Sequence, residues 1–332
     1  MELATLRVRG QRLWRQAKML PRYASYSLGQ TRPWTTPNRM YLESTNVCNL
    51  GCIMCPTGRG EQTRPKGYMD FDLFQHIVDE VAPFVETTTL HIWGEPLLHP
   101  RLTDMIRVCA AKGIRAEIST NATLLTEEKT DALLGSGLGA IYLCLDGATR
   151  DTYEKIRRRA DFDETTANIR HFLAERQRRG LRAPYASLQI IEMKPTAAEI
   201  RQFQDLWRGS GVDRVAVKPF DSWAGQVGDI NELDPDHDKP RLQRWPCPNL
   251  WYHVHIYWDG SLVRCDRDFN LDGPLGNVGD GVMKAWRGPQ MAELRRRHVQ
   301  GDFAGVRPCE TCSEWAWWKP GPFFAQGNRP AE

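Results

Sequence analysis

Short apolar segments alternate with longer amphipathic segments between residues 38 and 220. The apolar segments predict six strands: Arg39–Ser44, Thr88–Trp93, Arg115–Ser119, Ala140–Asp146, Tyr185–Met193 and Arg214–Lys218. The segments between them, from Asp70–Ala82 to Ala197–Ser210, have the spacing of helices. Repeated strand–helix units predict an α/β fold with a parallel sheet, and because successive crossovers share one hand, we expect the sheet to curve into a partial barrel. Functional side chains should then lie at the carboxyl ends of the strands.

The segments on either side of these units have a different composition. Residues 1–37 are basic and carry apolar residues at helical spacing, which predicts an N-terminal helix and a linker. Residues 221–246 are rich in Asp, Gly, Pro and Asn, as is typical of a linker. In residues 247–332 we predict the strands Tyr252–Trp258 and Ser261–Cys265 around an Asp-Gly turn, and a helix from Gly288 to His298. This last part is expected to form a small α+β domain.

Charge and hydropathy exclude several classes of partner. Lys and Arg number 44 against 41 Asp and Glu, so we expect no nucleic-acid partner. No apolar run approaches the roughly 20 residues that a membrane span requires, and the N-terminus lacks the apolar core of a secretory signal. We therefore expect a cytoplasmic protein with no membrane partner. Clustered cysteines in such a protein are more typical of metal binding or redox chemistry than of disulfides.

Three cysteines, Cys48, Cys52 and Cys55, form a C-x3-C-x2-C run directly after the first predicted strand. Three thiolates on one short loop can share one metal cluster and leave one of its metal sites open for an exogenous ligand. A redox dithiol or half of a zinc site fits this loop less well, because no His and no fourth Cys lies nearby in the sequence.

The run Cys48-Asn-Leu-Gly-Cys52-Ile-Met54-Cys55 resembles the cluster loop of the radical S-adenosylmethionine (radical SAM) enzymes, with Met54 at a position that is often aromatic. The resemblance implies a 4Fe-4S cluster whose open iron chelates S-adenosylmethionine (SAM). It also implies that the reduced cluster cleaves SAM to methionine and a 5′-deoxyadenosyl radical, which abstracts hydrogen from a substrate. The expected partners are a small-molecule substrate and a low-potential electron donor such as flavodoxin or ferredoxin.

Segments at later strand ends extend this resemblance. Trp93-Gly94-Glu95-Pro96 is similar to the GGEP segment of the family, with Trp in place of the first Gly. Ser119-Thr120-Asn121 is similar to its STN segment, and Leu145-Asp146-Gly147 with Tyr153 and Arg157 is similar to its SLDG and Y-x3-R pattern. By this resemblance Glu95 meets the amino group of SAM and Arg157 its carboxylate. The residues that the resemblance assigns to SAM binding are Met54, Gly94, Glu95, Ser119, Asn121, Asp146, Arg157 and Met193.

Four further cysteines, Cys247, Cys265, Cys309 and Cys312, are enough to ligate a second 4Fe-4S cluster completely, and structural zinc is the alternative. The segments around them resemble the SPASM/twitch extension of radical SAM proteins. Fuller SPASM extensions carry seven cysteines for two auxiliary clusters, so four cysteines favour a single auxiliary cluster. The resemblance therefore predicts a partial (β/α)6 TIM-like barrel of the radical SAM type with a small α+β twitch/SPASM domain.

Cys144, Glu192, Lys218 and Asp221 are the residues that we expect to act on the substrate, and Trp223 is a further candidate contact. Strand alternation places Cys144 on the same face as Asp146, so its thiol could deliver a hydrogen atom to a substrate radical inside the barrel. Filling of the barrel is the alternative role for Cys144. Lys218 and Asp221 could orient the substrate or accept a proton, and a surface ion pair is their alternative role.

The expected reaction is dehydrogenation or epimerisation of a small polar secondary metabolite, such as a sugar, aminoglycoside or aminocyclitol. Relatives with one auxiliary cluster include enzymes of both kinds. A SPASM-type maturase that modifies a ribosomally made peptide is the main alternative, although the 36-residue basic lead is too short for a separate leader-binding domain. A non-catalytic zinc protein that binds a partner is the third hypothesis.

Overall fold

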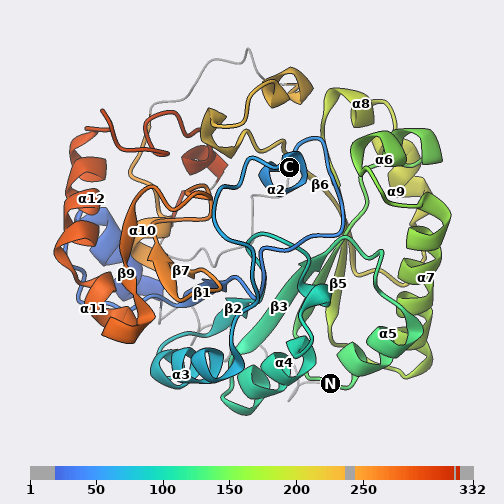
Figure 1. Ribbon diagram of the computed structural model, residues 1–332, viewed down its shortest axis with the longest axis horizontal. Helices are drawn as coiled ribbons and strands as arrows, with labels where there is room; N and C mark the ends of the chain where they lie inside the picture. Colours follow the sequence, from blue (N-terminus) through green and yellow to red (C-terminus); the bar gives the residue numbers. More distant parts are fainter. Residues whose placement is uncertain (1–18, 236–243, 318, 322–332) are drawn as a thin grey trace, which may run out of the picture.

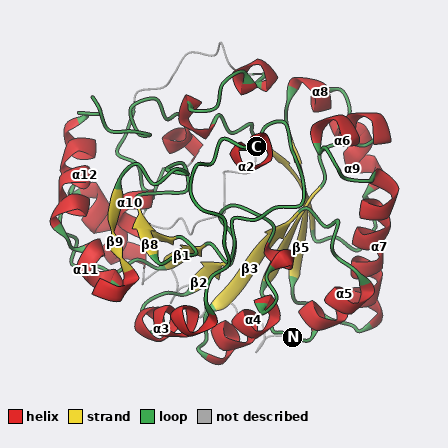
Figure 2. Cartoon of the chain, in the orientation of Figure 1, coloured by secondary structure: helices red, strands yellow, loops and turns green. Residues whose placement is uncertain are grey.

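The computed structural model describes residues 19–235, 244–317 and 319–321. One curved sheet forms its centre (Figures 1 and 2). Within these residues the sheet has nine strands in the order β6-β5-β4-β3-β2-β1-β7-β8-β9. The first six strands along the chain pair in parallel: β1 (Arg39–Leu42), β2 (Thr87–Thr89), β3 (Arg115–Thr120), β4 (Ala140–Cys144), β5 (Tyr185–Ile191) and β6 (Arg214–Lys218). The predicted α/β fold with a parallel sheet is confirmed.

Helices cover the outer face of the parallel strands (Figure 1). They are α3 (Phe71–Val81), α4 (Leu102–Ala111), α5 (Glu127–Leu134), α6 (Arg150–Ile156), α7 (Phe162–Arg178) and α9 (Ile200–Leu206). Several begin at a residue whose side chain caps the first turn; Asp70, for example, accepts hydrogen bonds from the backbone N–H groups of Asp72 and Leu73. Outward side chains such as Met40, Ile118 and Leu188 are fully buried beneath these helices. Burial of this apolar layer is the main stabilisation of the barrel.

The C-terminal strands continue the same sheet. Strand β7 (His253–Ile256) pairs in parallel with β1, and β8 (Ser261–Val263) and β9 (Pro274–Asn277) follow in antiparallel order. They are flanked by α10 (Asn249–Tyr252), α11 (Val282–Trp286) and α12 (Pro289–Gln300). The auxiliary cysteine region is therefore joined to the barrel through backbone hydrogen bonds along β1.

The remaining elements are short. They are α2 (Pro56–Arg59), α8 (Lys194–Ala197) and the 3-10 segments η1 (Pro96–Leu98), η2 (Trp223–Gly225), η3 (Ile230–Leu233), η4 (Val278–Asp280) and η5 (Glu314–Trp317). Residues 19–27 are helical, whereas the greater part of the predicted N-terminal helix lies outside the described residues. No helix in the described part of the chain has the length and apolar character that crossing a membrane requires.

The second strand is shorter than the sequence predicts. It ends at Thr89 instead of Trp93, because the chain turns away from the sheet in front of Gly94, which has φ of 76°. Leu90 still donates its backbone N–H to the Glu117 carbonyl of β3 at 2.8 Å, whereas Ile92 and Trp93 pack among the loop residues of the site. Strand β9 and helix α11 have no counterpart among the predicted elements.

Candidate functional site

The loop that carries Cys48, Cys52 and Cys55 lies at the carboxyl end of β1 and packs against the end of α6. The backbone N–H of Gly51 donates to the carbonyl of Arg158, and that of Ile53 to the carbonyl of Ile156, each at 3.0 Å. A Cβ on Gly58 would lie 2.5 Å from the backbone N of Cys52, so only glycine fits there. These contacts fix the path of the cysteine loop.

The thiols of Cys48 and Cys52 lie within electrostatic reach of each other and of Cys55. Burial raises the pKa of Cys48 to about 11 and that of Cys52 to about 12, and the nearby Cys55 raises both further. The charge of Arg157 and a hydrogen bond from the backbone N–H of Leu50 to Cys48 oppose this rise in pKa. All three thiols are free of disulfides. Buried neighbouring thiols of this kind need bound metal to remain thiolates, and they suit a cluster.

The segment around Gly94 packs directly on the chain that enters the cysteine loop. A Cβ on Gly94 would lie 2.6 Å from the carbonyl oxygen of Thr45 and 2.7 Å from that of Val47. The backbone N–H of Glu95 donates to the same Val47 carbonyl at 2.8 Å. Glycine is therefore required at this close approach of two backbones.

The buried carboxylate of Glu95 joins the loop after β2 to the end of β3. It accepts hydrogen bonds from the backbone N–H groups of Leu97 (3.0 Å) and Asn121 (2.8 Å) and from the hydroxyl of Thr120 (2.7 Å). Both carboxylate oxygens thus have protein partners, and burial raises the pKa of Glu95. The structure shows Glu95 ordering two loops of the site, and a contact with SAM stays a prediction.

Asn121 lies beside the cysteine loop. Its side-chain amide donates to the Asn49 side chain at 2.9 Å and lies 4.0 Å from the sulfur of Cys48. Asn49 in turn donates to the hydroxyl of Thr123 at 2.8 Å. The loop after β3 therefore supports the cysteine loop from one side.

Asp146 and Arg157 form a buried ion pair at the end of β4. The Arg157 side chain donates to one Asp146 oxygen from Nε (2.9 Å) and Nη2 (2.7 Å), while the other oxygen accepts the backbone N–H of Ile191 (2.8 Å). Arg157 also lies within electrostatic reach of Cys52 and Cys144. The pair thus places a cation together with its carboxylate partner next to the cysteine loop, and a contact of Arg157 with the carboxylate of SAM stays a prediction.

The second cysteine set gathers Cys247, Cys265, Cys309 and Cys312 from three separate segments. Burial raises the pKa of all four thiols, to about 12 at Cys247 and about 11 at Cys309. Cys309 raises the pKa of both Cys247 and Cys265, and Cys247 raises that of Cys312, so the four thiols are neighbours. None forms a disulfide.

The cysteine sets supply the thiolate donors that iron-sulfur clusters use. A cluster of four irons spaces its thiolates more widely than the shell of one ion, because each thiolate binds a different iron. Free thiols that are buried or half-buried and lie close together therefore fit 4Fe-4S clusters at both sites.

The inner face of the barrel is polar, in contrast to its outer face. Cys144 points inward at the end of β4, and its sulfur lies 3.1 Å from the hydroxyl oxygen of Ser119. The backbone N–H of Ser119 donates to Nδ1 of His91 at 3.0 Å. Deeper in the barrel, the ring of Tyr41 stacks on that of His255 with centroids 4.7 Å apart. The sequence motifs did not indicate His91 or His255, because an isolated histidine carries no signal.

The other predicted substrate residues lie in different environments. Glu192 and Lys218 are exposed at the ends of β5 and β6, and the backbone N–H of Glu192 donates to the Lys218 carbonyl. Met193 is fully buried. Asp221 forms an ion pair with Arg267 at 2.5 Å, and the Asp221 side chain is only 12% exposed. This ion pair is therefore not at the surface, where the alternative role of Asp221 would have placed it. Trp223 is half-buried against Trp93, with ring centroids 4.8 Å apart.

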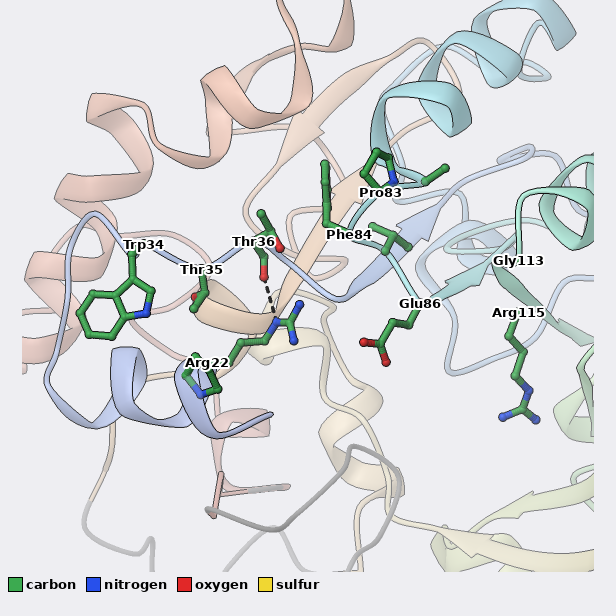
Figure 3. Close-up of a pocket in the computed structure, with 12 residues that line it drawn as sticks. Arg22, Trp34, Thr35, Thr36, Pro83, Phe84, Glu86, Gly113 and Arg115 are labelled. Carbon is green, nitrogen blue, oxygen red and sulfur yellow. Dashed lines mark hydrogen bonds between the residues drawn. The ribbon is translucent and has the colours of Figure 1, made fainter. Parts of the chain in front are cut away.

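A cavity of about 710 Å³ lies away from this site (Figure 3). It is lined by residues at the amino ends of β2 and β3, including Glu86 and Arg115, and by Arg22, which donates to the Thr36 carbonyl at 2.9 Å. The loop that carries Cys48, Cys52 and Cys55 follows the carboxyl end of β1. The cavity and this cysteine loop are thus at opposite ends of the barrel.

Comparison with known proteins agrees with this geometry. Residues 42–181 match the family model of the radical SAM superfamily, and residues 247–313 match SPASM, an iron-sulfur cluster-binding domain. The chain is a radical SAM protein with a SPASM domain. A radical SAM domain implies SAM and a 4Fe-4S cluster, and a SPASM domain implies auxiliary iron-sulfur binding.

Individual relatives of this radical SAM protein differ in activity. A tungsten-containing aldehyde ferredoxin oxidoreductase cofactor-modifying protein of Pyrococcus furiosus is 30% identical over 180 residues, 54% of this chain and 50% of that protein. The mycofactocin maturase MftC of Mycobacterium tuberculosis is 26% identical over 132 residues, 40% of this chain and 33% of that protein. The chain thus spans half or less of the length of these relatives.

Solved structures share the fold at low sequence identity. SuiB of Streptococcus suis, bound to SAM, has a TM-score of 0.65 at 13% identity and covers 84% of this chain and 72% of its own. BtrN, in complex with SAM and 2-DOIA, has a TM-score of 0.56 at 16% identity and covers 83% of this chain and 92% of its own. These likenesses support the radical SAM and SPASM/twitch architecture.

Proposed function

We propose that this chain is a radical SAM enzyme that epimerises or dehydrogenates a small polar substrate inside the barrel. In this proposal Cys48, Cys52 and Cys55 hold the SAM-binding cluster, and Cys247, Cys265, Cys309 and Cys312 hold one auxiliary cluster. When bound, SAM and its cluster supply abstraction of a hydrogen atom from the substrate. The observation that supports the proposal most is the inward orientation of the Cys144 thiol. Cys144 lies at the end of β4, beside the end of β3, where Ser119 contacts its sulfur.

The polar inner face supports a small polar substrate. Its side chains come from successive strands, and they include Arg39, Tyr41, Thr89, Glu117, Tyr142, Gln189 and His255. Arg39 and Glu117 form an ion pair at 2.5 Å, so their charges largely cancel. Hydroxyl and amino groups of a sugar or aminocyclitol can exchange hydrogen bonds with such a surface, whereas a large apolar substrate would leave it unsatisfied.

In epimerisation, Cys144 returns a hydrogen atom to the substrate after the first abstraction. The Cys144 S–H bond breaks and a C–H bond forms on the opposite face of the substrate carbon. The oxidised Cys144 sulfur then takes up one electron from the external reductant and one proton from solvent. The hydroxyl of Ser119, 3.1 Å from the Cys144 sulfur, holds the thiol toward the barrel interior.

In dehydrogenation, the substrate first loses a hydrogen atom from carbon. It then loses one electron and one hydroxyl proton. An auxiliary cluster held by the four C-terminal cysteines would supply the electron acceptor. The exposed residues Glu192 and Lys218 are the candidates for handling the proton at the barrel mouth. Asp221 is less suited to this role, because its carboxylate already accepts from Arg267 and from the backbone N–H of Trp223.

Solvent deuterium distinguishes the two reactions. The reconstituted chain is incubated in D2O with SAM, dithionite and a panel of amino sugars and aminocyclitols, and products are analysed by mass spectrometry. Epimerisation predicts one deuterium at the inverted carbon and loss of the epimer in Cys144→Ala. A ketone without deuterium at that carbon supports dehydrogenation. Turnover of none of these compounds contradicts the proposed substrate class.

A peptide substrate is the second candidate, since the mycofactocin maturase MftC matches 40% of this chain. The same assay with short peptides tests it. Turnover of a peptide together with failure of every polyol would assign the chain to peptide modification.

A further inference from the structure

Residues 221–226, directly after β6, contact both cysteine sites. On the barrel side, the indole Nε1–H of Trp223 donates to the backbone carbonyl of Met54 at 2.7 Å. Met54 immediately precedes Cys55, so this bond holds the peptide next to a predicted cluster ligand. Trp223 also packs on Trp93, which precedes Gly94.

On the other side, the same segment is bonded to the loops of the auxiliary cysteines. Asp221 accepts from Arg267, two residues after Cys265, at 2.5 Å. The hydroxyl of Ser222 donates to Glu314, two residues after Cys312, at 3.0 Å. The hydroxyl of Thr311 donates to the carbonyl of Ala224.

The backbone of this segment is strained. Trp223 and Ala224 have φ of 52° and 59°, in the left-handed region that non-glycine residues rarely adopt. Such a conformation persists only where surrounding contacts hold it. Here Asp221 accepts the backbone N–H of Trp223 at 2.9 Å, and Gln226 donates to the carbonyls of Trp223 and Arg267, each at 2.8 Å. Two of these bonds lie within the segment, and the third, to the Arg267 carbonyl, joins it to the loop after Cys265.

We propose that Trp223 is a positioning residue that couples the auxiliary cysteine site to the SAM-binding loop. Ordered loops around Cys265 and Cys312 hold residues 221–226, and Trp223 then fixes the peptide between Met54 and Cys55. The inference rests on the cysteine assignments above and is independent of the substrate.

Trp223→Phe tests the barrel side, because it removes the hydrogen bond to Met54 and keeps an aromatic ring. In the reconstituted full chain we expect the dissociation constant for SAM to rise about five- to tenfold. The electron paramagnetic resonance signal of the reduced SAM-binding cluster should broaden at unchanged iron content. Trp286→Phe is the matched control, because it removes an indole bond to the Thr35 carbonyl at 3.1 Å, away from both sites. A Trp223→Phe variant that matches this control in SAM affinity and spectrum overturns the proposal.

Cys312→Ala and Asp221→Asn test the coupling from the auxiliary side. Each should weaken SAM binding by a factor similar to that of Trp223→Phe, while the SAM-binding cluster retains about four irons per chain. Combining either with Trp223→Phe should weaken binding no further, since residues in one network are not additive. Asp221→Asn keeps every cysteine and remains informative if Cys312→Ala fails to fold. The coupling is overturned if Asp221→Asn binds SAM as tightly as the wild type, or if its effect adds fully to that of Trp223→Phe. Loss of all iron from Trp223→Phe also contradicts the coupling.

Discussion

Arg157 and Asp146 form a two-bond ion pair at 2.7 and 2.9 Å with side-chain exposures of only 9% and 1%. The pair joins the end of β4 to the end of α6 and lies beside the cysteine loop. It is therefore a part of the site in which local stability and ligand binding depend on the same contact.

Asp146→Asn should destabilise the protein by about 3 kcal/mol, because it leaves the buried Arg157 charge without its anionic partner. Urea denaturation of the iron-free protein measures the free energy of unfolding. Asp104→Asn is the matched control, because Asp104 pairs with Arg101 and Arg107 at the exposed surface, where the loss should stay below about 0.5 kcal/mol. Equal losses in the two variants would contradict the assigned role of the buried pair.

Gly94→Ala should cost at least about 2 kcal/mol and displace the cysteine loop, because the new Cβ would lie 2.6 Å from the Thr45 carbonyl oxygen. Gly60→Ala is a sharp control, since Gly60 has the same φ of 76° with no atom within 4 Å of the added Cβ. That variant should cost only about 1 kcal/mol from its backbone conformation. Thermal unfolding of both variants side by side measures the difference, and similar losses would show that the close approach is unimportant.

His255 should make stability depend on pH. Burial lowers the pKa of His255 to about 4, whereas the unfolded chain has a pKa of about 6.5 at this residue. Between these values the unfolded state binds more protons, so the free energy of unfolding falls as the pH falls. His255→Phe keeps the ring stack on Tyr41 and does not titrate. Between pH 7 and 5 the wild type should lose about 2 kcal/mol relative to this variant.

The comparison uses urea denaturation of the iron-free proteins at both pH values. His76→Gln, which replaces an exposed histidine of α3, controls for the loss of a histidine as such. Parallel pH dependence of the wild type and His255→Phe would contradict neutral burial of His255.

The sequence predicted the parallel sheet because each strand and its helix carry a local pattern. It also predicted both cysteine groups, since their spacing is visible without a structure. The pairing of β7 with β1 could not be read in this way, because it joins residues more than 200 positions apart through backbone hydrogen bonds. The early end of β2 depends on the backbone contact of Gly94 with Thr45, which is equally non-local.

Side-chain roles were harder to predict than positions. Asp221 and Trp223 were expected to contact substrate, yet the structure bonds them to Arg267 and to Met54. The partner of each residue comes from a distant segment of the chain, so no local sequence pattern indicates the contact. Glu95 similarly has three protein partners that only the folded chain brings together.

The most direct test of the account is formation of 5′-deoxyadenosine from SAM by the anaerobically reconstituted, dithionite-reduced protein, quantified by mass spectrometry. The wild type and Cys109→Ala, a buried cysteine of α4 outside both sites, should form it at similar rates. The triple variant Cys48→Ala, Cys52→Ala, Cys55→Ala should form none. Equal formation by the triple variant and the wild type would contradict the claim that this loop holds the cluster that binds SAM.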